Sequence, residues 1–174
     1  MRATIVIVFQ FFVSISLAAP MPGMGSAKLS EKISTVAFKS LGFAMDLMQN
    51  EWTLEMQNQS ASKQFRFKSL ENNGTLSIRI DDLKEEASLD EYSKKWIRDY
   101  PNYGFEILAQ KSIKIGKAPA LVIDLAQKEN QKQIRQVLFL QNQRVVVLTC
   151  HNSFKAFKAT AESCNRAFNS FKWL

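Results

Sequence analysis

The chain has 174 residues, a formal net charge of +7 at pH 7, two cysteines and a single histidine. Its basic residues are dispersed, with Lys94-Lys95 as the longest basic run, whereas nucleic-acid binders gather basic residues along one groove-facing element. The charge pattern therefore argues against nucleic acid as a partner, and one histidine argues against a transition-metal site.

The N-terminal residues 1–18 are typical of a secretory signal peptide. Arg2 supplies a short basic start, residues 3–15 are mostly apolar, and residues 16–18 (SLA) offer a cleavage site. The alternative is an uncleaved membrane anchor, but the apolar run is shorter than the roughly 20 residues of a spanning helix. We expect an exported chain, periplasmic or extracellular, that is not transmembrane after cleavage. Residues 19–27 then form a flexible lead-in and residues 28–174 a single domain, long enough to bury a core.

Alternating apolar and polar residues predict strands in the first half of the domain. Asn72-Asn73-Gly74 supplies a turn before the last of them. The expected strands are residues 33–38, 43–47, 52–56, 65–67 and 76–80.

A helix is predicted to begin after Ser88, which forms a capping box with Glu91, and to end at Pro101. Its apolar stripe consists of Leu89, Tyr92, Trp96 and Tyr100. Such spacing is typical of a helix that packs its apolar face on a sheet. The alternative interpretation is that the aromatic residues line a ligand groove.

The second half predicts four strands followed by a C-terminal helix. The expected strands are residues 105–115, 118–126, 134–141 and 144–150, with a polar loop over 127–133. The last two carry apolar residues on both faces, which is typical of central strands covered on both sides. The helix places its apolar residues on one face at alternating spacings of three and four. They are Phe154, Phe157, Ala161, Cys164, Phe168 and Phe171.

This order of elements predicts an α+β fold, with a mostly antiparallel sheet of about six to eight strands and helices packed on it. Cys150 would then end a central strand and Cys164 would lie on the helix above it. Two cysteines in an exported chain usually pair, so a Cys150–Cys164 disulfide is expected, with two buried free thiols as the alternative.

Several segments, in this order, resemble the PsbP-like superfamily, which includes many exported bacterial domains of unknown function. They are FAMDLMQNEW, GTLSIRIDDL, SLDEY, IGKAPALVIDL, RQVLFLQNQRVVVLTC and FNSF. The resemblance implies an αβα sandwich and a role in binding or assembly rather than chemistry. It transfers neither a functional residue nor a photosystem role.

Two constellations invite a chemical interpretation. His151 directly follows Cys150, but neighbours on a strand point to opposite faces and should not form a nucleophile–base dyad. We expect His151 to lie at the end of the sheet and Ser153 to cap the following helix.

An acidic cluster of Asp81, Asp82, Glu85 and Glu86 could bind calcium, but it lacks the spacing of a known calcium loop. A solvated connection between strand and helix is the favoured alternative. Asn58-Gln59-Ser60 and Asn73-Gly74-Thr75 match the glycosylation pattern, which is common by chance.

No Gly-rich phosphate loop and no G-x-S-x-G elbow is present in the sequence, so we expect no catalytic residue and no cofactor. The favoured function is a non-enzymatic binding or assembly-accessory domain for a partner protein, an envelope component or a small apolar ligand. The alternative is a hydrolase or other enzyme without a recognisable signature.

Overall fold

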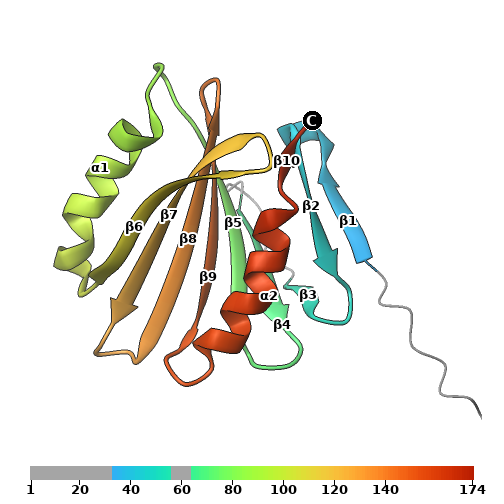
Figure 1. The fold of residues 1–174 in the computed structure, drawn as a ribbon, viewed down its shortest axis with the longest axis vertical. Coiled ribbons are helices and arrows are strands. Elements are labelled where there is room, and N and C mark those ends of the chain that lie inside the picture. Colours follow the sequence, from blue (N-terminus) through green and yellow to red (C-terminus); the bar gives the residue numbers. More distant parts are fainter. Residues whose placement is uncertain (1–32, 56–63) are drawn as a thin grey trace, which may run out of the picture. The chain divides into compact units, whose positions relative to one another are not determined.

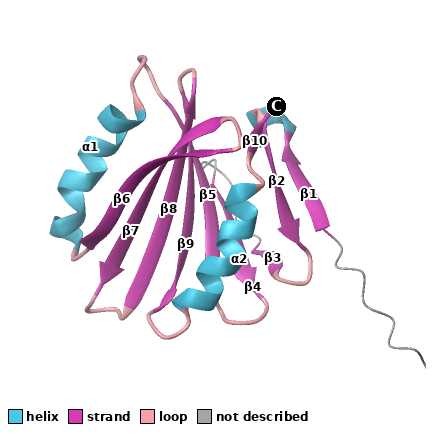
Figure 2. Cartoon of the chain, viewed as in Figure 1, coloured by secondary structure: helices cyan, strands magenta, loops and turns pink. Residues whose placement is uncertain are grey.

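The computed structural model describes residues 33–55 and 64–174 (Figure 1). The predicted signal peptide (1–18), the lead-in (19–27) and the sequence Asn58-Gln59-Ser60 lie outside the described residues. Figure 2 shows the elements by type. In chain order they are β1 (Ile33–Phe38), η1 (Lys39–Leu41), β2 (Phe43–Met48), β3 (Trp52–Glu55), β4 (Gln64–Ser69), β5 (Thr75–Asp82), α1 (Leu89–Asp99), η2 (Tyr100–Tyr103), β6 (Glu106–Ile115), β7 (Ala118–Gln127), β8 (Lys132–Gln141), β9 (Arg144–Ser153), α2 (Phe157–Asn169) and β10 (Lys172–Trp173).

The strands form a seven-stranded sheet of order β3-β4-β5-β9-β8-β7-β6 and a three-stranded sheet of order β1-β2-β10. All pairings are antiparallel, so the predicted α+β class with a mostly antiparallel sheet is confirmed. The sequence pattern did not separate β1 and β2 from the main sheet, and it did not predict β10. Alternation predicts a strand and its faces, but it does not predict which strand will be its partner.

The two faces of the large sheet pack against different elements. On one face, α1 residues such as Leu89 and Ile97 pack against a cluster that includes Leu138 and Val147. On the other face, α2 and β2 contribute to a larger cluster with Val137 and Leu148. Strands β8 and β9 are therefore covered on both sides, which explains their continuous apolar runs.

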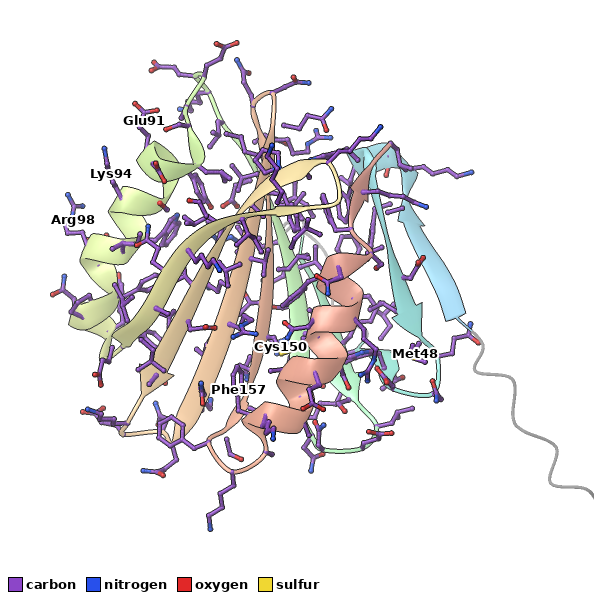
Figure 3. The ribbon with its side chains drawn as sticks, viewed as in Figure 1. Met48, Glu91, Lys94, Arg98, Cys150 and Phe157 are labelled. Atoms are coloured by element: carbon purple, nitrogen blue, oxygen red, sulfur yellow. A yellow bond between two sulfur atoms is a disulfide. The ribbon has the colours of Figure 1, made fainter. Side chains whose placement is uncertain are left out.

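Helix α1 begins as predicted. The Ser88 hydroxyl accepts the Glu91 backbone N–H at 3.2 Å, and a Glu91 carboxylate oxygen accepts the Ser88 N–H at 2.8 Å. Helix α1 ends at Asp99. The chain then forms the short 3-10 helix η2, whose first turn contains Pro101. Figure 3 shows Glu91, Lys94 and Arg98 on the outward side of α1, and all three are exposed.

Helix α2 differs from the prediction at both ends. Ser153 does not cap it, because β9 continues to Ser153 and a backbone turn from Ser153 to Ala156 precedes the helix. The N-cap is Ala156, without a side-chain hydrogen bond. Phe154 lies before the helix and is half-buried, and Phe171 lies after it but is buried. The predicted stripe therefore combines a helix face with its two flanking segments.

Cys150 on β9 and Cys164 on α2 lie at disulfide distance, with sulfur atoms 2.12 Å apart and Cα atoms 6.2 Å apart. Both side chains are fully buried. Figure 3 shows Cys150 under α2. The pair links the helix to a central strand of the sheet.

Candidate functional site

Cys150 and His151 lie on opposite faces of the large sheet. Cys150 belongs to the core cluster under α2, whereas His151 is half-buried on the other face, between Thr75 of β5 and Ile134 of β8. Burial lowers the pKa of His151, and the nearby Lys132 lowers it further. The structure therefore does not bring the two side chains together as a nucleophile and its base.

The structure disperses the acidic cluster that could have bound calcium. Asp81 pairs with Arg79 at 3.1 Å, Asp82 pairs with Arg144 at 2.8 Å, and Glu85 and Glu86 are exposed. Within residues 33–55 and 64–174, no group of three or more His, Cys, Asp or Glu side chains is placed to hold a metal ion.

A polar network lies beneath α1, beside a small cavity of about 150 Å³. The Tyr92 hydroxyl donates to Asp81, and an Arg79 N–H donates to Tyr92 at 3.0 Å. The Arg79 guanidinium also lies 4.8 Å from the centre of the Trp96 ring. Burial and the hydrogen bond to Asp81 raise the pKa of Tyr92 to about 12. A general acid or base works best with a pKa near the working pH, so this network is suited to holding α1 rather than to proton transfer.

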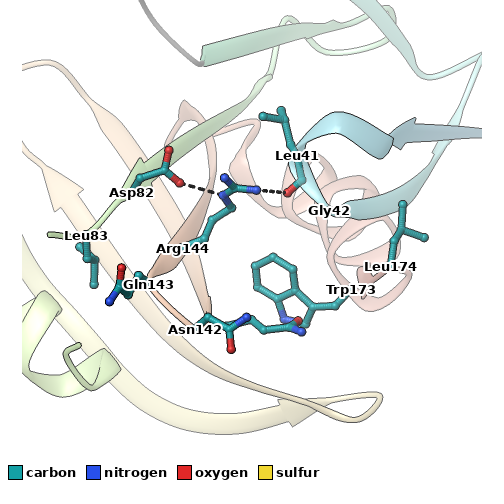
Figure 4. Close-up of a pocket in the computed structure, with 10 residues that line it drawn as sticks. Leu41, Gly42, Asp82, Leu83, Asn142, Gln143, Arg144, Trp173 and Leu174 are labelled. Atoms are coloured by element: carbon teal, nitrogen blue, oxygen red, sulfur yellow. Dashed lines mark hydrogen bonds and ion pairs between the residues drawn. The ribbon is translucent and has the colours of Figure 1, made fainter. Parts of the chain in front are cut away.

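A second cavity, of about 490 Å³, opens where the loops after β5 and between β8 and β9 meet the turn before β2 (Figure 4). Arg144 lines it, and Figure 4 shows its side chain between Asp82 and Leu41. Its guanidinium donates to Asp82 Oδ1 at 2.8 Å and to the Leu41 carbonyl at 2.9 Å. These bonds tie the two sheets together, and Arg144 thus has a structural role at this junction.

A third cavity, of about 310 Å³, lies between α2 and strands β6, β7 and β8; we call it the helix–sheet cleft. Six of its eleven lining residues are apolar, and three of the polar ones, Asp124, Arg135 and Asn165, form a hydrogen-bonded group that we call the polar end of the cleft. Ligand sites commonly combine apolar walls with a few placed polar groups in a volume of about 300–1,000 Å³. The lining residues are Ala109, Lys111, Ile113, Ile115, Val122, Asp124, Arg135, Val137, Asn165, Phe168 and Asn169.

The polar end of the cleft is built around a cross-strand ion pair. Asp124 of β7 lies directly opposite Arg135 of β8. The Arg135 guanidinium donates to Asp124 Oδ1 at 2.7 Å and Oδ2 at 2.9 Å, and to Asn165 Oδ1 of α2 at 3.2 Å. The hydrogen bond to Asp124 raises the pKa of Arg135. Arg135 therefore stays positively charged, and Asp124 lies beside it as its counter-ion.

Hydrogen-bond donors remain available at this end. A guanidinium has five N–H groups, and Arg135 uses three of them in these bonds. Asn165 uses its carbonyl oxygen, and among the described residues its amide N–H groups have no acceptor. The cleft can thus surround an apolar body with Ile113, Val122 and Val137 and donate hydrogen bonds to oxygen atoms at one end.

This site is not among those predicted from the sequence. Asp124 lies in a predicted strand whose other residues are almost all apolar, and no motif marks either Asp124 or Arg135. A charged residue inside such a strand, two positions from Val122, was the available signal, because a charge is rarely placed in a central strand without a partner.

Comparisons with solved structures support the fold. Cyanobacterial PsbP (CyanoP) from Synechocystis sp. PCC 6803 superposes with a TM-score of 0.65, at 9% identity, covering 90% of this chain and 100% of that one. A protein of unknown function from Pseudomonas aeruginosa gives 0.54 at 15% identity, covering 69% and 95%. A protein from Bacteroides thetaiotaomicron gives 0.51 at 13% identity, covering 76% and 45%.

The chain has a PsbP-like fold, which confirms the fold that the resemblance in the sequence implies. Searches of protein-family profiles and of curated protein sequences found no match. In the described part of the chain, no helix has the length and apolar character needed to cross a membrane.

Proposed function

We propose that this protein is an exported, non-enzymatic binding domain whose helix–sheet cleft takes a small ligand with an apolar body and an uncharged polar head. The observation that carries the proposal is the cleft itself, which is lined both by the apolar Ile113, Val122 and Val137 and by the hydrogen-bond donors Arg135 and Asn165. Of the partners expected from the sequence, a small apolar ligand suits this site better than a protein or an envelope polymer.

The ion pair explains why the ligand's head should be uncharged. Asp124 already neutralises Arg135 through two hydrogen bonds. A carboxylate or ammonium buried at the Arg135 end would lose its hydration, and the charges of Arg135 and Asp124 at that end already neutralise each other, so burial there is costly. The side chain of Lys111 is exposed, and water and salt screen its charge. A hydroxyl, ester or amide oxygen could instead accept the free N–H groups.

Export is supported by two features of the chain. The first residues are typical of a signal peptide, the two cysteines lie at disulfide distance, and disulfides persist mainly outside the cytoplasm. The PsbP-like fold is in keeping with this assignment. Cleavage after residue 18 and a single domain over 28–174 remain part of the proposal.

The alternative of an enzyme has less support. His151 and Tyr92 have shifted pKa values, but the Tyr92 shift leads away from neutral pH, and neither residue lines the helix–sheet cleft. No hydrogen bond joins the His151 ring to a hydroxyl or thiol within the described ranges. A binding role therefore accounts for more of the observed geometry.

The proposal can be tested with three straight-chain probes that have alkyl tails of similar length and different heads: decan-1-ol, decanoate and decyltrimethylammonium. Each is added to ¹⁵N-labelled protein, and amide shifts are followed by NMR. We expect decan-1-ol to shift amides of β6–β8 and α2, with affinity at least several-fold above that of the two charged probes. Stronger binding of decanoate or decyltrimethylammonium would contradict the proposed head group, and no binding of any probe would contradict the proposed site.

A cleft-filling variant locates the binding. Val122→Phe places a ring in the cleft and should abolish these shifts, whereas Leu108→Phe, at an exposed position of the neighbouring strand, should leave them unchanged. If both variants bind decan-1-ol as the wild type does, the ligand lies elsewhere.

A further inference from the structure

A cluster of cations lies on the face of the large sheet opposite α2, away from the helix–sheet cleft. Register places Lys68, Thr75 and His151 in one row across β4, β5 and β9, and Arg66, Ser77 and Thr149 in the next row. Directly opposed residues of antiparallel strands share a face. Lys132 of β8 joins this face, since it lies two residues from Ile134, the partner of His151. We call Arg66, Lys68, Lys132 and His151 the basic face.

The basic face is weakly compensated by negative charge. Glu55 is its nearest carboxylate, at 3.9 Å from Arg66 Nε, with both side chains more than 40% exposed. The other five arginines of the described ranges lie within 3.1 Å of a carboxylate. No ion pair of Lys68 or Lys132 is found among the described residues.

The pKa of His151 is lowered in part by the positive charges around it. Burial is the main cause of its lowered pKa, but Lys132 on β8 and Arg66 and Lys68 on β4 lower it as well, and Glu55 on β3 opposes them only in part. Three cations beside a half-buried imidazole destabilise its charged form. Natural sequences break such local rules mainly at functional sites.

We propose that the basic face binds a linear polyanion whose charges are phosphate groups. The cations extend from β4 to β8, three strand spacings or about 14 Å, which exceeds a single phosphate and matches a chain with repeated charges. Arg66 offers a planar fork, and Lys68, Lys132 and the hydroxyls of Ser77 and Thr149 offer donors from other directions. The oxygens of a tetrahedral phosphate accept hydrogen bonds from donors in several directions. The two oxygens of a carboxylate can both be bound by the parallel N–H groups of one guanidinium.

Other anionic partners fit this face less well. Single-stranded nucleic acids stack their bases on exposed aromatic side chains, and none of Arg66, Lys68, Lys132 and His151 is a Phe, Tyr or Trp. Proteins that lie on a membrane insert apolar side chains between the headgroups, and the exposed residues of this face, Arg66 and Lys132, are cationic. The basic face and the helix–sheet cleft lie on opposite faces of the sheet, so binding at the one does not require binding at the other.

The single histidine provides the test. Its imidazole proton resonances in the full chain are followed against pH by NMR, with and without inorganic polyphosphate of defined length. We expect polyphosphate to raise the pKa of His151, because a bound anion stabilises the imidazolium, and we expect the shift to disappear at high salt. An unchanged titration curve, or a shift that is insensitive to salt, would overturn the inference.

Variants show whether the cations act as a unit. Lys68→Gln and Lys132→Gln should each weaken polyphosphate binding by up to about fivefold, and the combination with Arg66→Gln should weaken it more than tenfold. Lys158→Gln, an exposed lysine of α2 on the other side of the sheet, should have no effect. Equal losses in Lys158→Gln and the basic-face variants would show non-specific attraction to net charge and would overturn the proposed site.

The same assay compares the binding of polyphosphate with that of other polyanions. Vesicles of phosphatidylglycerol, an oligo-thymidine and an oligo-glutamate peptide replace polyphosphate at equal charge concentration. The inference expects polyphosphate to bind most tightly, and tighter binding of any of the other three would overturn the choice of partner.

Discussion

The ring of Phe171 stacks on the ring of Phe139, with centroids 3.8 Å apart and planes inclined by 11°. Phe139 belongs to a central strand of the large sheet, and Phe171 follows α2. The centroids of the Phe171 and Phe43 rings are 5.5 Å apart, and Phe43 belongs to β2. The Phe171 side chain therefore contacts both the large sheet and the small sheet, directly after α2.

Phe171→Ala should therefore destabilise the protein by about 3–5 kcal/mol, because truncating a buried aromatic ring leaves a cavity. Urea unfolding followed by circular dichroism measures the change in unfolding free energy. Leu174→Ala, at an exposed position three residues away, should change it by less than about 0.5 kcal/mol. A loss below about 1 kcal/mol for Phe171→Ala would mean that the stack is not part of the core.

The Cys150–Cys164 pair closes a short loop, with a sequence separation of 14 residues. In the chain-entropy model a disulfide of this span contributes about 3 kcal/mol. Replacing both cysteines with Ala should lower the unfolding free energy by about that amount. Mass spectrometry of unreduced, native protein should find no thiol open to alkylation, and two alkylated thiols would contradict the disulfide.

Arg144 hydrogen-bonds Asp82 of the large sheet and the carbonyl of Leu41, which precedes β2 of the small sheet (Figure 4). Arg144→Leu removes its bonds to Asp82 and to the Leu41 carbonyl, and should cost about 1–3 kcal/mol because hydrogen bonds to charged groups are lost. Hydrogen exchange should also accelerate at Leu174, whose N–H donates to Gly42 in the same region. Arg98→Leu, which breaks an exposed pair with Asp99, is the matched control and should have little effect.

His151 should make stability depend on pH. Its pKa is lowered in the folded protein, so the unfolded chain binds the proton more tightly. The stability that neutral His151 confers is present above the unfolded pKa of about 6.5 and is lost as the pH falls from there through the folded pKa. Thermal unfolding of His151→Gln between pH 8 and 5 should show a smaller decline than the wild type, and an identical decline would contradict the shift.

Much of the fold could be predicted from the sequence because local signals were strong. Ser88 and Glu91 predicted the start of α1, and the apolar runs of β8 and β9 predicted central strands. Ser153 and Phe154 were misplaced because the end of β9 and the backbone turn before α2 have no distinctive residue pattern.

The helix–sheet cleft was not predictable in the same way. Asp124, Arg135 and Asn165 come from three elements, and their contacts depend on strand register and on the position of α2. No spacing in the sequence encodes that arrangement. The three polar residues can be identified in the sequence, but the sequence does not show that they contact one another.

The proposed function requires that the helix–sheet cleft hold an apolar ligand. Intermolecular nuclear Overhauser effects between decan-1-ol and methyl-labelled wild-type protein measure this contact. We expect cross-peaks from the alkyl chain to the methyl groups of Ile113, Val122 and Val137, which line the cleft. Cross-peaks confined to methyl groups outside the cleft, such as those of the exposed Leu54 and Leu70, would contradict it.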